Sequence, residues 1–186
     1  MQHWTIIIPV KGTASAKSRF GPDDNSALAL AMALDTVEVA MRVGDVVVVT
    51  ADATPFAELG ARVIPDPGSG LNAAISAGVD RISGPTAILL GDHPALTGEE
   101  LRDALAHADA FDRALVADAD GEGSALTTSH GTHEPRFGRA SREAHLAAGY
   151  VELEGHWPGL RRDVDTAEQL AALPHVGPRT SALLKR

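Results

Sequence analysis

Short apolar runs alternate along the chain with longer stretches in which apolar residues recur at helical spacing. The short runs, rich in aliphatic and β-branched residues, predict strands buried on both faces, at residues 5–10, 45–50, 62–64, 86–90, 115–117 and 125–128. The longer stretches predict amphipathic helices, at residues 26–42, 71–82, 101–107, 142–148 and 167–173, with a short helix or a frayed end in 177–186. Alternating strands and helices predict an α/β fold, with a mainly parallel central sheet and helices on both faces.

Capping sequences set the expected starts of several helices. Thr97 followed by Glu100, and Thr166 followed by Gln169, have the spacing of a capping box. Thr54 before a proline predicts an N-cap with proline at the first helical position. Ser141 is the expected N-cap of the helix that follows it.

Length and composition narrow the class of protein. With 186 residues, 44% of them hydrophobic and 22% charged, the chain is expected to form a single domain over residues 1–186. The absence of cysteine excludes disulfides and thiolate metal sites, so a metal would need Asp, Glu or His. No stretch approaches the ~20 apolar residues that span a bilayer, and no signal-peptide pattern opens the chain. A cytoplasmic protein without a membrane partner is expected.

The net charge of −9 argues against a nucleic-acid partner, because nucleic-acid-binding proteins carry a basic face. It does not argue against small anionic substrates, because a few local cations and a metal ion outweigh a distant field.

A basic loop of small residues follows the first predicted strand. Lys11, Lys17 and Arg19 stand close together, with Gly, Ala, Ser and Thr between them. Small residues let backbone N–H groups approach phosphates, and the cations offset phosphate charge. A solvated basic surface loop has the same composition. The spacing does not match a Walker A loop.

A glycine-rich loop, residues 66–72, precedes the helix predicted from residue 71. Gly68 and Gly70 let a ligand approach the backbone, and Asn72 can both donate to and accept from a nucleobase edge. A plain turn with a helix cap is the competing interpretation.

Acidic residues follow the fourth predicted strand and recur late in the chain. Asp92 stands at the carboxyl end of residues 86–90, where a carboxylate can hold Mg²⁺ together with phosphate oxygens. Asp163 and Asp165 stand two residues apart, and one can face a metal while the other caps the next helix or orients a neighbour. Turn residues and an acid-rich helix start are the competing interpretations. His93 can be a metal ligand, but a single histidine beside a proline is more often structural.

Taken together, these segments resemble the phospholactate/phosphoenolpyruvate guanylyltransferase family of deazaflavin coenzyme (F-420) biosynthesis. The matching pieces occur in the expected order over nearly the whole chain: Ile8-Pro9-Val10-Lys11, Ala16-Lys17-Ser18-Arg19, Leu34-Asp35-Thr36, Asp66-Pro67-Gly68-Ser69-Gly70-Leu71-Asn72, Gly91-Asp92-His93-Pro94-Ala95-Leu96, Phe137-Gly138-Arg139-Ala140-Ser141, His145, and Pro158-Gly159-Leu160-Arg161-Arg162-Asp163-Val164-Asp165-Thr166.

The resemblance implies a three-layer nucleotidyltransferase fold, like that of nucleotide-diphospho-sugar transferases and molybdenum-cofactor guanylyltransferases. It implies GTP and a small phosphorylated carboxylic acid as substrates, Mg²⁺ as cofactor, and release of pyrophosphate. By this resemblance the metal ligands are Asp92, Asp163 and Asp165, and the catalytic residues are Lys17, Asp92 and Asp163. The nucleotide would contact Lys11, Lys17, Arg19, Gly70, Leu71 and Asn72, and the acid would contact Ser124, Gly138 and Ser141.

Two positions depart from the family pattern. A Gly-Thr-Thr-Leu stretch is usual on the acid side, whereas this chain has Ser124 and Ala125 at its centre. Ser124 keeps a hydroxyl, but Ala125 cannot donate a hydrogen bond. His93 stands where an apolar residue is usual.

Several acceptors remain open at this stage. Phosphoenolpyruvate is placed ahead of 2-phospho-L-lactate, because the Ala-, Asp- and Arg-rich composition resembles actinobacterial family members. 3-Phosphoglycerate and molybdopterin are alternatives, although molybdopterin enzymes usually open with a Gly-Gly-rich loop and only Gly12 is present. A non-catalytic GTP-binding homologue is a third hypothesis. The next enzyme of the pathway, taking a labile product, is a possible partner.

Overall fold

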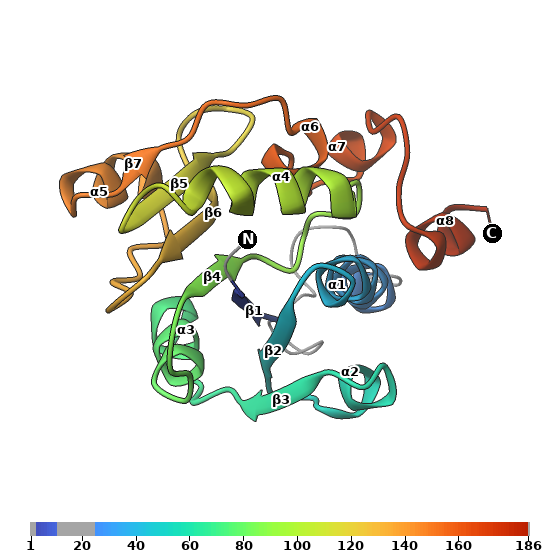
Figure 1. Ribbon diagram of the computed structural model, residues 1–186. Helices are drawn as coiled ribbons and strands as arrows, with labels where there is room; N and C mark the ends of the chain where they lie inside the picture. The colour runs from blue at the N-terminus through green and yellow to red at the C-terminus, as the bar shows by residue number, and fades with distance from the viewer. Residues whose placement is uncertain (1–2, 11–24, 186) are drawn as a thin grey trace.

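A seven-stranded sheet forms the centre of the computed structural model, which describes residues 3–10 and 25–185 (Figure 1). The strand order is β3-β2-β1-β4-β6-β5-β7. The bounds are β1 Thr5–Pro9, β2 Asp45–Thr50, β3 Arg62–Pro65, β4 Thr86–Leu89, β5 Arg113–Ala117, β6 Ser124–Ser129 and β7 Val151–Glu152. β6 runs antiparallel to both of its neighbours, and the other strand pairs are parallel. The predicted α/β fold with a mainly parallel sheet is confirmed.

Helices cover both faces of this sheet. Their bounds are α1 Asn25–Met41, α2 Thr54–Glu58, α3 Leu71–Val79, α4 Gly98–Ala108, α5 Ser141–Ala147, α6 Pro158–Arg161, α7 Ala167–Ala171 and α8 Pro178–Leu184. Side chains of α1, α2 and α4 pack on one face, and α3 packs on the other. None of the helices in the described part of the chain has both the length and the apolar character needed to cross a membrane.

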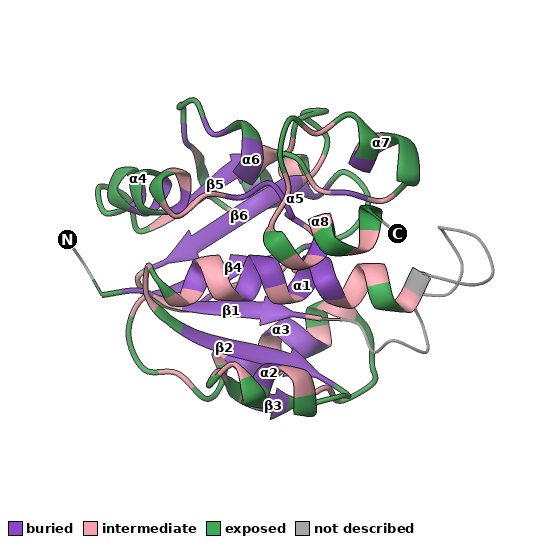
Figure 2. Cartoon of the chain, turned by 90° about the vertical axis from the view of Figure 1, so that its right-hand side faces the viewer, coloured by how far each residue is buried: buried purple, intermediate pink, exposed green. Residues whose placement is uncertain are grey.

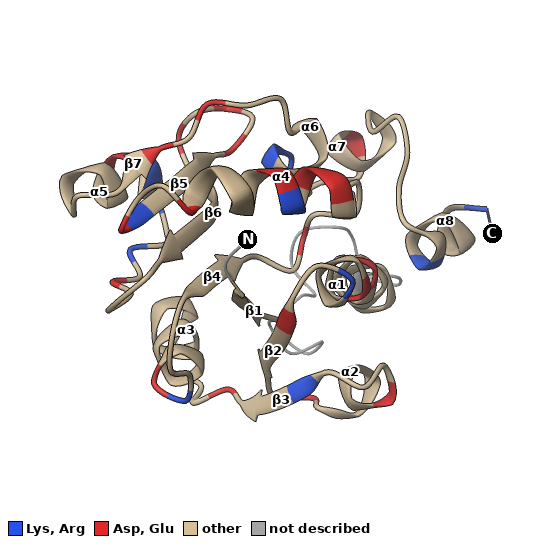
Figure 3. Ribbon diagram, viewed as in Figure 1, with Lys and Arg blue, Asp and Glu red and all other residues tan. Residues whose placement is uncertain are grey.

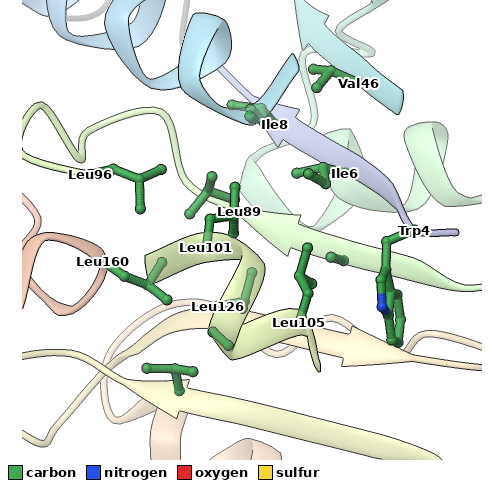
Figure 4. Close-up of a cluster of buried hydrophobic side chains, with 14 of the residues drawn as sticks. Trp4, Ile6, Ile8, Val46, Leu89, Leu96, Leu101, Leu105, Leu126 and Leu160 are labelled. Atoms are coloured by element: carbon green, nitrogen blue, oxygen red, sulfur yellow. The ribbon is translucent and has the colours of Figure 1, made fainter. Parts of the chain in front are cut away.

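The larger core lies between the sheet and helices α1 and α4. Figure 4 shows Ile6, Ile8 and Leu89 of the sheet facing Leu101 and Leu105 of α4, all of them buried. Burying each such side chain contributes roughly 1.5–3 kcal/mol. Figure 2 shows that the strands are almost entirely buried, as their continuous apolar runs predicted.

The opposite face of the sheet packs against α3. Alternate residues of the same strands, such as Ile7 and Val49, contact the buried Ile75. Gly78 brings the helix close to the sheet, because an added Cβ would lie 2.7 Å from Ile7 and 3.0 Å from Val49. This close packing fixes the loop before α3 relative to the ends of β1 and β2.

The expected helix caps agree with the structure at two helices and not at two others. Both capping boxes, at Thr97 and Thr166, are confirmed. The N-cap prediction for Thr54 was wrong: Thr54 is the first residue of α2, after Ala53. The Asp52 carboxylate accepts from the Thr54 N–H at 3.3 Å instead, so an upstream side chain supplies the cap.

The N-cap prediction for Ser141 was also wrong. Ala140 precedes α5 in the left-handed region, at φ 53°, and Ser141 is the first helical residue. The Ser141 hydroxyl oxygen accepts from the Ser124 N–H at 2.9 Å, so it joins α5 to the start of β6. The structure also adds β7 and α6, which the sequence patterns did not predict.

The last helix, α8, packs against α1 (Figure 1). Its N-terminus is capped from α1, because the buried Asp35 carboxylate accepts from Arg179 N–H at 3.1 Å and from Thr180 N–H at 2.9 Å. Asp35 therefore has a structural role, 144 residues away in sequence from the first of its partners.

Candidate active site

A pocket of about 740 Å³ opens at the carboxyl ends of the parallel strands. Residues that follow β1, β2, β4 and β5 line it, together with the start of β6 and the start of α5. Ligands of open α/β sheets bind at this edge, because the loops after parallel strands gather there. Three of the segments singled out from the sequence reach this pocket: the glycine-rich loop, the segment of Asp92, and the segment of Asp163 and Asp165.

The glycine-rich loop reaches the pocket through Leu71. Gly68 and Gly70 have φ of 74° and 96°, values that residues with a Cβ rarely adopt. An added Cβ at either glycine would meet nothing within 4 Å, so backbone conformation, rather than space, is the constraint. Gly70 and Asn72 are not among the described residues that line the pocket.

Four aspartates that also line the pocket lie near one another: Asp92, Asp118, Asp163 and Asp165. The carbonyl of Asp92 accepts from the Val164 N–H at 3.0 Å, which holds residues 163–165 beside the end of β4. Burial raises the pKa of Asp163 to about 6, and the negative charges of Asp92, Asp165 and Asp118 add to the rise. Asp163 is therefore a partly buried carboxylate with three other carboxylates near it.

This donor set fits Mg²⁺ shared with a nucleotide. Within residues 3–10 and 25–185, no group of three or more His, Asp or Glu side chains could hold a metal ion by itself. Mg²⁺ commonly takes one or two carboxylates and completes its shell with substrate phosphates and water. Oxygen donors at Asp92 and Asp163, both on the pocket wall, meet that requirement.

The charge of the described pocket wall also favours a cation. Among the described lining residues, Arg139 carries positive charge as a Lys or Arg side chain. The acidic lining residues are Asp52, Asp92, Asp118, Asp163 and Asp165. Figure 3 shows the described Lys and Arg residues scattered over many elements and not gathered on one face. A triphosphate would need additional positive charge to bind such a wall.

Lys11, Lys17 and Arg19, the expected source of that charge, lie outside the described residues. Their assignment to the triphosphate remains a prediction.

Asp118 was not singled out from the sequence, although it follows a predicted strand. Its carboxylate accepts from the N–H groups of Glu122 at 3.0 Å and Gly123 at 2.7 Å. These bonds fold the loop between β5 and β6 so that Gly123 and Ser124 face the pocket. A carboxylate directly after a buried strand was the available signal.

Ser124, Gly138 and Ser141, predicted to hold the acid, all line one part of the pocket. The structure joins Ser124 to Ser141 by a hydrogen bond, and it joins Ser124 to a histidine to which the sequence assigned no role. The Ser124 hydroxyl lies 3.0 Å from Nδ1 of His145. Nε2 of the same ring accepts from the Arg136 N–H at 3.0 Å. Gly138 adopts φ 138°, which favours glycine.

The two departures from the family pattern both lie at the pocket. Ala125 is buried and contributes no polar side-chain atom to the wall. His93 is 1% exposed, and its Nε2 lies 3.8 Å from Oδ1 of Asp92. Burial lowers the pKa of His93, so the ring is neutral at pH 7.

Comparison with known protein families finds guanylyltransferases, the family that the sequence motifs resemble. Residues 4–149 match the family model described as "Guanylyl transferase CofC like". The phosphoenolpyruvate guanylyltransferase of Geodermatophilus obscurus is 44% identical over 201 residues, covering 97% of this chain and 94% of that protein. The enzyme of the same name from Streptomyces coelicolor is 45% identical over 204 residues, covering 98% and 96%.

Solved structures agree on the fold. A nucleotidyl transferase from Methanothermobacter superposes with a TM-score of 0.67 at 18% identity, covering 100% of both chains. A protein of Desulfovibrio desulfuricans assigned to the nucleotide-diphospho-sugar transferases gives a TM-score of 0.64 at 14% identity, covering 100% of this chain and 95% of that one. The fold is therefore of the nucleotide-diphospho-sugar transferase type, as predicted.

Proposed function

Since the chain belongs to the CofC-like guanylyl transferase family, we propose that it transfers GMP from GTP to phosphoenolpyruvate, with release of pyrophosphate, in coenzyme F-420 biosynthesis. The observation that supports this most directly is one pocket lined both by carboxylates and by the Ser124 and Ser141 hydroxyls. The carboxylates suit a metal-bound triphosphate, and the hydroxyls suit a small acid.

The two substrates would approach from different loops. The guanosine side would lie along the loop of Gly70, Leu71 and Asn72, of which Leu71 lines the pocket. The triphosphate would extend toward Asp92 and Asp163 and toward the cations Lys11, Lys17 and Arg19 predicted from sequence. The acid would occupy the part lined by Ser124, Gly138 and Ser141.

The reaction forms one P–O bond and breaks another. A phosphate oxygen of the acid attacks the α-phosphorus of GTP, and the bond from that phosphorus to the bridging oxygen breaks. Pyrophosphate leaves with the bonding electrons, and the acid becomes linked to GMP through a diphosphate. The attacking oxygen is already ionised, so no side chain is needed as general base.

Mg²⁺, when bound, would neutralise charge on the phosphates and on the departing pyrophosphate. The chain's own contribution is positional. Asp92 and Asp163 would hold the cation at the carboxyl end of β4, with Asp165 beside them. Hydroxyl and backbone donors would align the acid for in-line attack.

The direct test is pyrophosphate release from GTP and Mg²⁺, with phosphoenolpyruvate, 2-phospho-L-lactate and 3-phosphoglycerate compared as acceptors. Release with phosphoenolpyruvate at the highest kcat/KM is the expected result, and mass spectrometry should identify the GMP adduct. Faster turnover of another acid would reassign the acceptor. A folded protein that binds GTP and turns over none of the three would overturn the proposal.

The sheet and its pocket also bear on how many domains the chain forms. One sheet collects strands from Thr5 to Glu152, and its pocket uses residues as far along as Asp165. We therefore propose that residues 1–186 act as one nucleotidyltransferase domain.

A further inference from the structure

We propose that His145 is a positioning residue that fixes the hydroxyl hydrogen of Ser124 toward the acid in the pocket. This inference rests on the proposed function and assigns a role to a side chain that does not itself line the pocket. It also names the chemical property the acid must have at this position, which is an anionic oxygen that accepts hydrogen bonds.

The hydrogen bond at Nε2 determines which nitrogen of the His145 ring carries the hydrogen. Nε2 of His145 lies 3.0 Å from the backbone nitrogen of Arg136, which can only donate. Nε2 must therefore carry a lone pair and no hydrogen. The hydrogen of the neutral ring is then on Nδ1, which faces the Ser124 hydroxyl at 3.0 Å.

Burial keeps the ring in this state and in this orientation. His145 is 0% exposed, and it packs edge-on against Phe137 at 4.9 Å and against Tyr150 at 5.0 Å between ring centres. Burial lowers the pKa of His145 to about 4; the Ser141 carbonyl opposes this fall and the Arg136 charge adds to it. The ring therefore remains neutral at the pH of a cell.

The His145 ring in turn determines where the hydroxyl hydrogen of Ser124 points. A serine hydroxyl carries one hydrogen, and here its oxygen accepts the Nδ1–H of His145. Its own hydrogen is then available to the pocket that Ser124 lines. Without His145 the hydroxyl would rotate freely, and ordering it on binding would cost entropy.

The neighbouring serine is arranged in the same way. The Ser141 oxygen accepts from the Ser124 N–H at 2.9 Å, which leaves the Ser141 hydroxyl hydrogen for the pocket. Two adjacent hydroxyls thus present hydrogens and not lone pairs. Such a subsite favours a carboxylate or phosphate oxygen over an alcohol or an amide N–H.

The test compares His145 with His133, another buried histidine between two hydroxyls. His133 lies 3.1 Å from the Thr86 hydroxyl and 2.9 Å from the Thr127 hydroxyl, and it does not line the pocket. His145→Phe keeps an aromatic ring and removes both nitrogens, whereas His145→Asn retains a donor near the position of Nδ1. His133→Phe and His133→Asn are the matched controls.

We expect His145→Phe to raise the KM for phosphoenolpyruvate about tenfold, with the KM for GTP changed less than about twofold, since one charge-assisted hydrogen bond is misdirected. His145→Asn should recover part of the loss. Ser124→Ala should show the same selective rise, Ser124→Thr should not, and the double variant of His145 and Ser124 should be no worse than Ser124→Ala.

Nitrogen-15 NMR of the histidine rings gives a readout independent of turnover. The hydrogen on Nδ1 and the lone pair on Nε2 of His145 are expected in the intact protein. A hydrogen on Nε2 would overturn the inference.

Equal effects in the His145 and His133 variants, or an unchanged KM for the acid in Ser124→Ala, would overturn it as well. These outcomes require an active wild-type enzyme. If the wild-type protein turns over no acid, the proposed function fails first, and the role assigned to His145 fails with it.

Discussion

The side-chain amide of Asn72 makes two hydrogen bonds to the backbone of Phe137. Its Oδ1 accepts from the Phe137 N–H at 2.9 Å, and its Nδ2 donates to the Phe137 carbonyl at 2.9 Å. The first turn of α3, predicted from sequence to meet the nucleoside, is thereby tied to the segment that leads into Gly138. Asn72 thus ties the loop proposed for the nucleoside to the loop proposed for the acid.

Replacing Asn72 by Asp should separate these two loops. The carboxylate would place an acceptor against the Phe137 carbonyl, and losing one such bond costs about 1–2 kcal/mol. We expect a rise in the KM for the acid of about tenfold, measured at saturating GTP. Ser69→Ala, an exposed neighbour, is the control. A larger change in the KM for GTP than for the acid would instead favour the base-contact interpretation.

Removing either proposed metal carboxylate should abolish most of the activity. Metal binding supplies several kcal/mol of transition-state stabilisation, so Asp92→Asn and Asp163→Asn should each lower kcat/KM at least about a hundredfold. Titration calorimetry of Mg²⁺ with GTP present should show weakened binding in both variants. Asp120→Asn is the control, because Asp120 is exposed and does not line the pocket. Unchanged Mg²⁺ binding in Asp92→Asn would remove Asp92 from the metal site.

The sequence predicted those parts of the fold that local patterns determine. Short continuous apolar runs predicted the central strands, and the capping boxes at Thr97 and Thr166 predicted helix starts. The four-residue helix Pro158–Arg161 and the two-residue strand Val151–Glu152 are too short to show a period.

Local sequence patterns could not predict hydrogen bonds between side chains that are far apart in the sequence. Ser141 has a typical N-cap residue type, yet its hydroxyl is used by Ser124, 17 positions away. His145 and Ser124 are 21 positions apart, and neither alone suggests a contact. The aspartates at the pocket were predictable individually, because each follows a strand or stands in a matched motif. Their closeness to one another could not be predicted, because the segments that carry them are far apart in the sequence.

Loss of the Asp35 carboxylate should release α8 from α1. It caps α8 through two backbone N–H groups, and Arg179 lies 3.7 Å from its Oδ1. Because cap removal costs about 0.5–2 kcal/mol, Asp35→Ala should lower the free energy of unfolding within that range and speed proteolysis near residues 177–185. Arg42→Ala, which removes an exposed ion pair of α1 with Glu38, is the control. Equal proteolysis of both variants would show that Asp35 does not anchor the helix.

The buried histidines should make the protein sensitive to mild acid. Burial lowers the pKa of His133 to about 3, with the charges of His145 and Arg113 adding to the fall, and burial lowers that of His145 to about 4. In the unfolded chain histidine binds a proton near pH 6.5. Between pH 6.5 and about 4 the unfolded state therefore binds more protons, and the free energy of unfolding falls as the pH falls.

Each such histidine contributes a slope of up to about 1.4 kcal/mol per pH unit in that window. Asp163 acts in the opposite direction below pH 6, because its pKa is raised in the fold to about 6 and protonation then favours the folded state. We therefore compare how steeply the free energy of unfolding falls with pH in the wild type and in a histidine variant. His133→Gln, measured by urea unfolding at pH 7, 6, 5 and 4.5, should lose stability at pH 7 but show a shallower decline toward acid than the wild type. The exposed His156→Gln should follow the wild-type slope. Parallel curves for the wild type and His133→Gln would show that His133 is not held neutral by burial, and would place the acid sensitivity elsewhere in the fold.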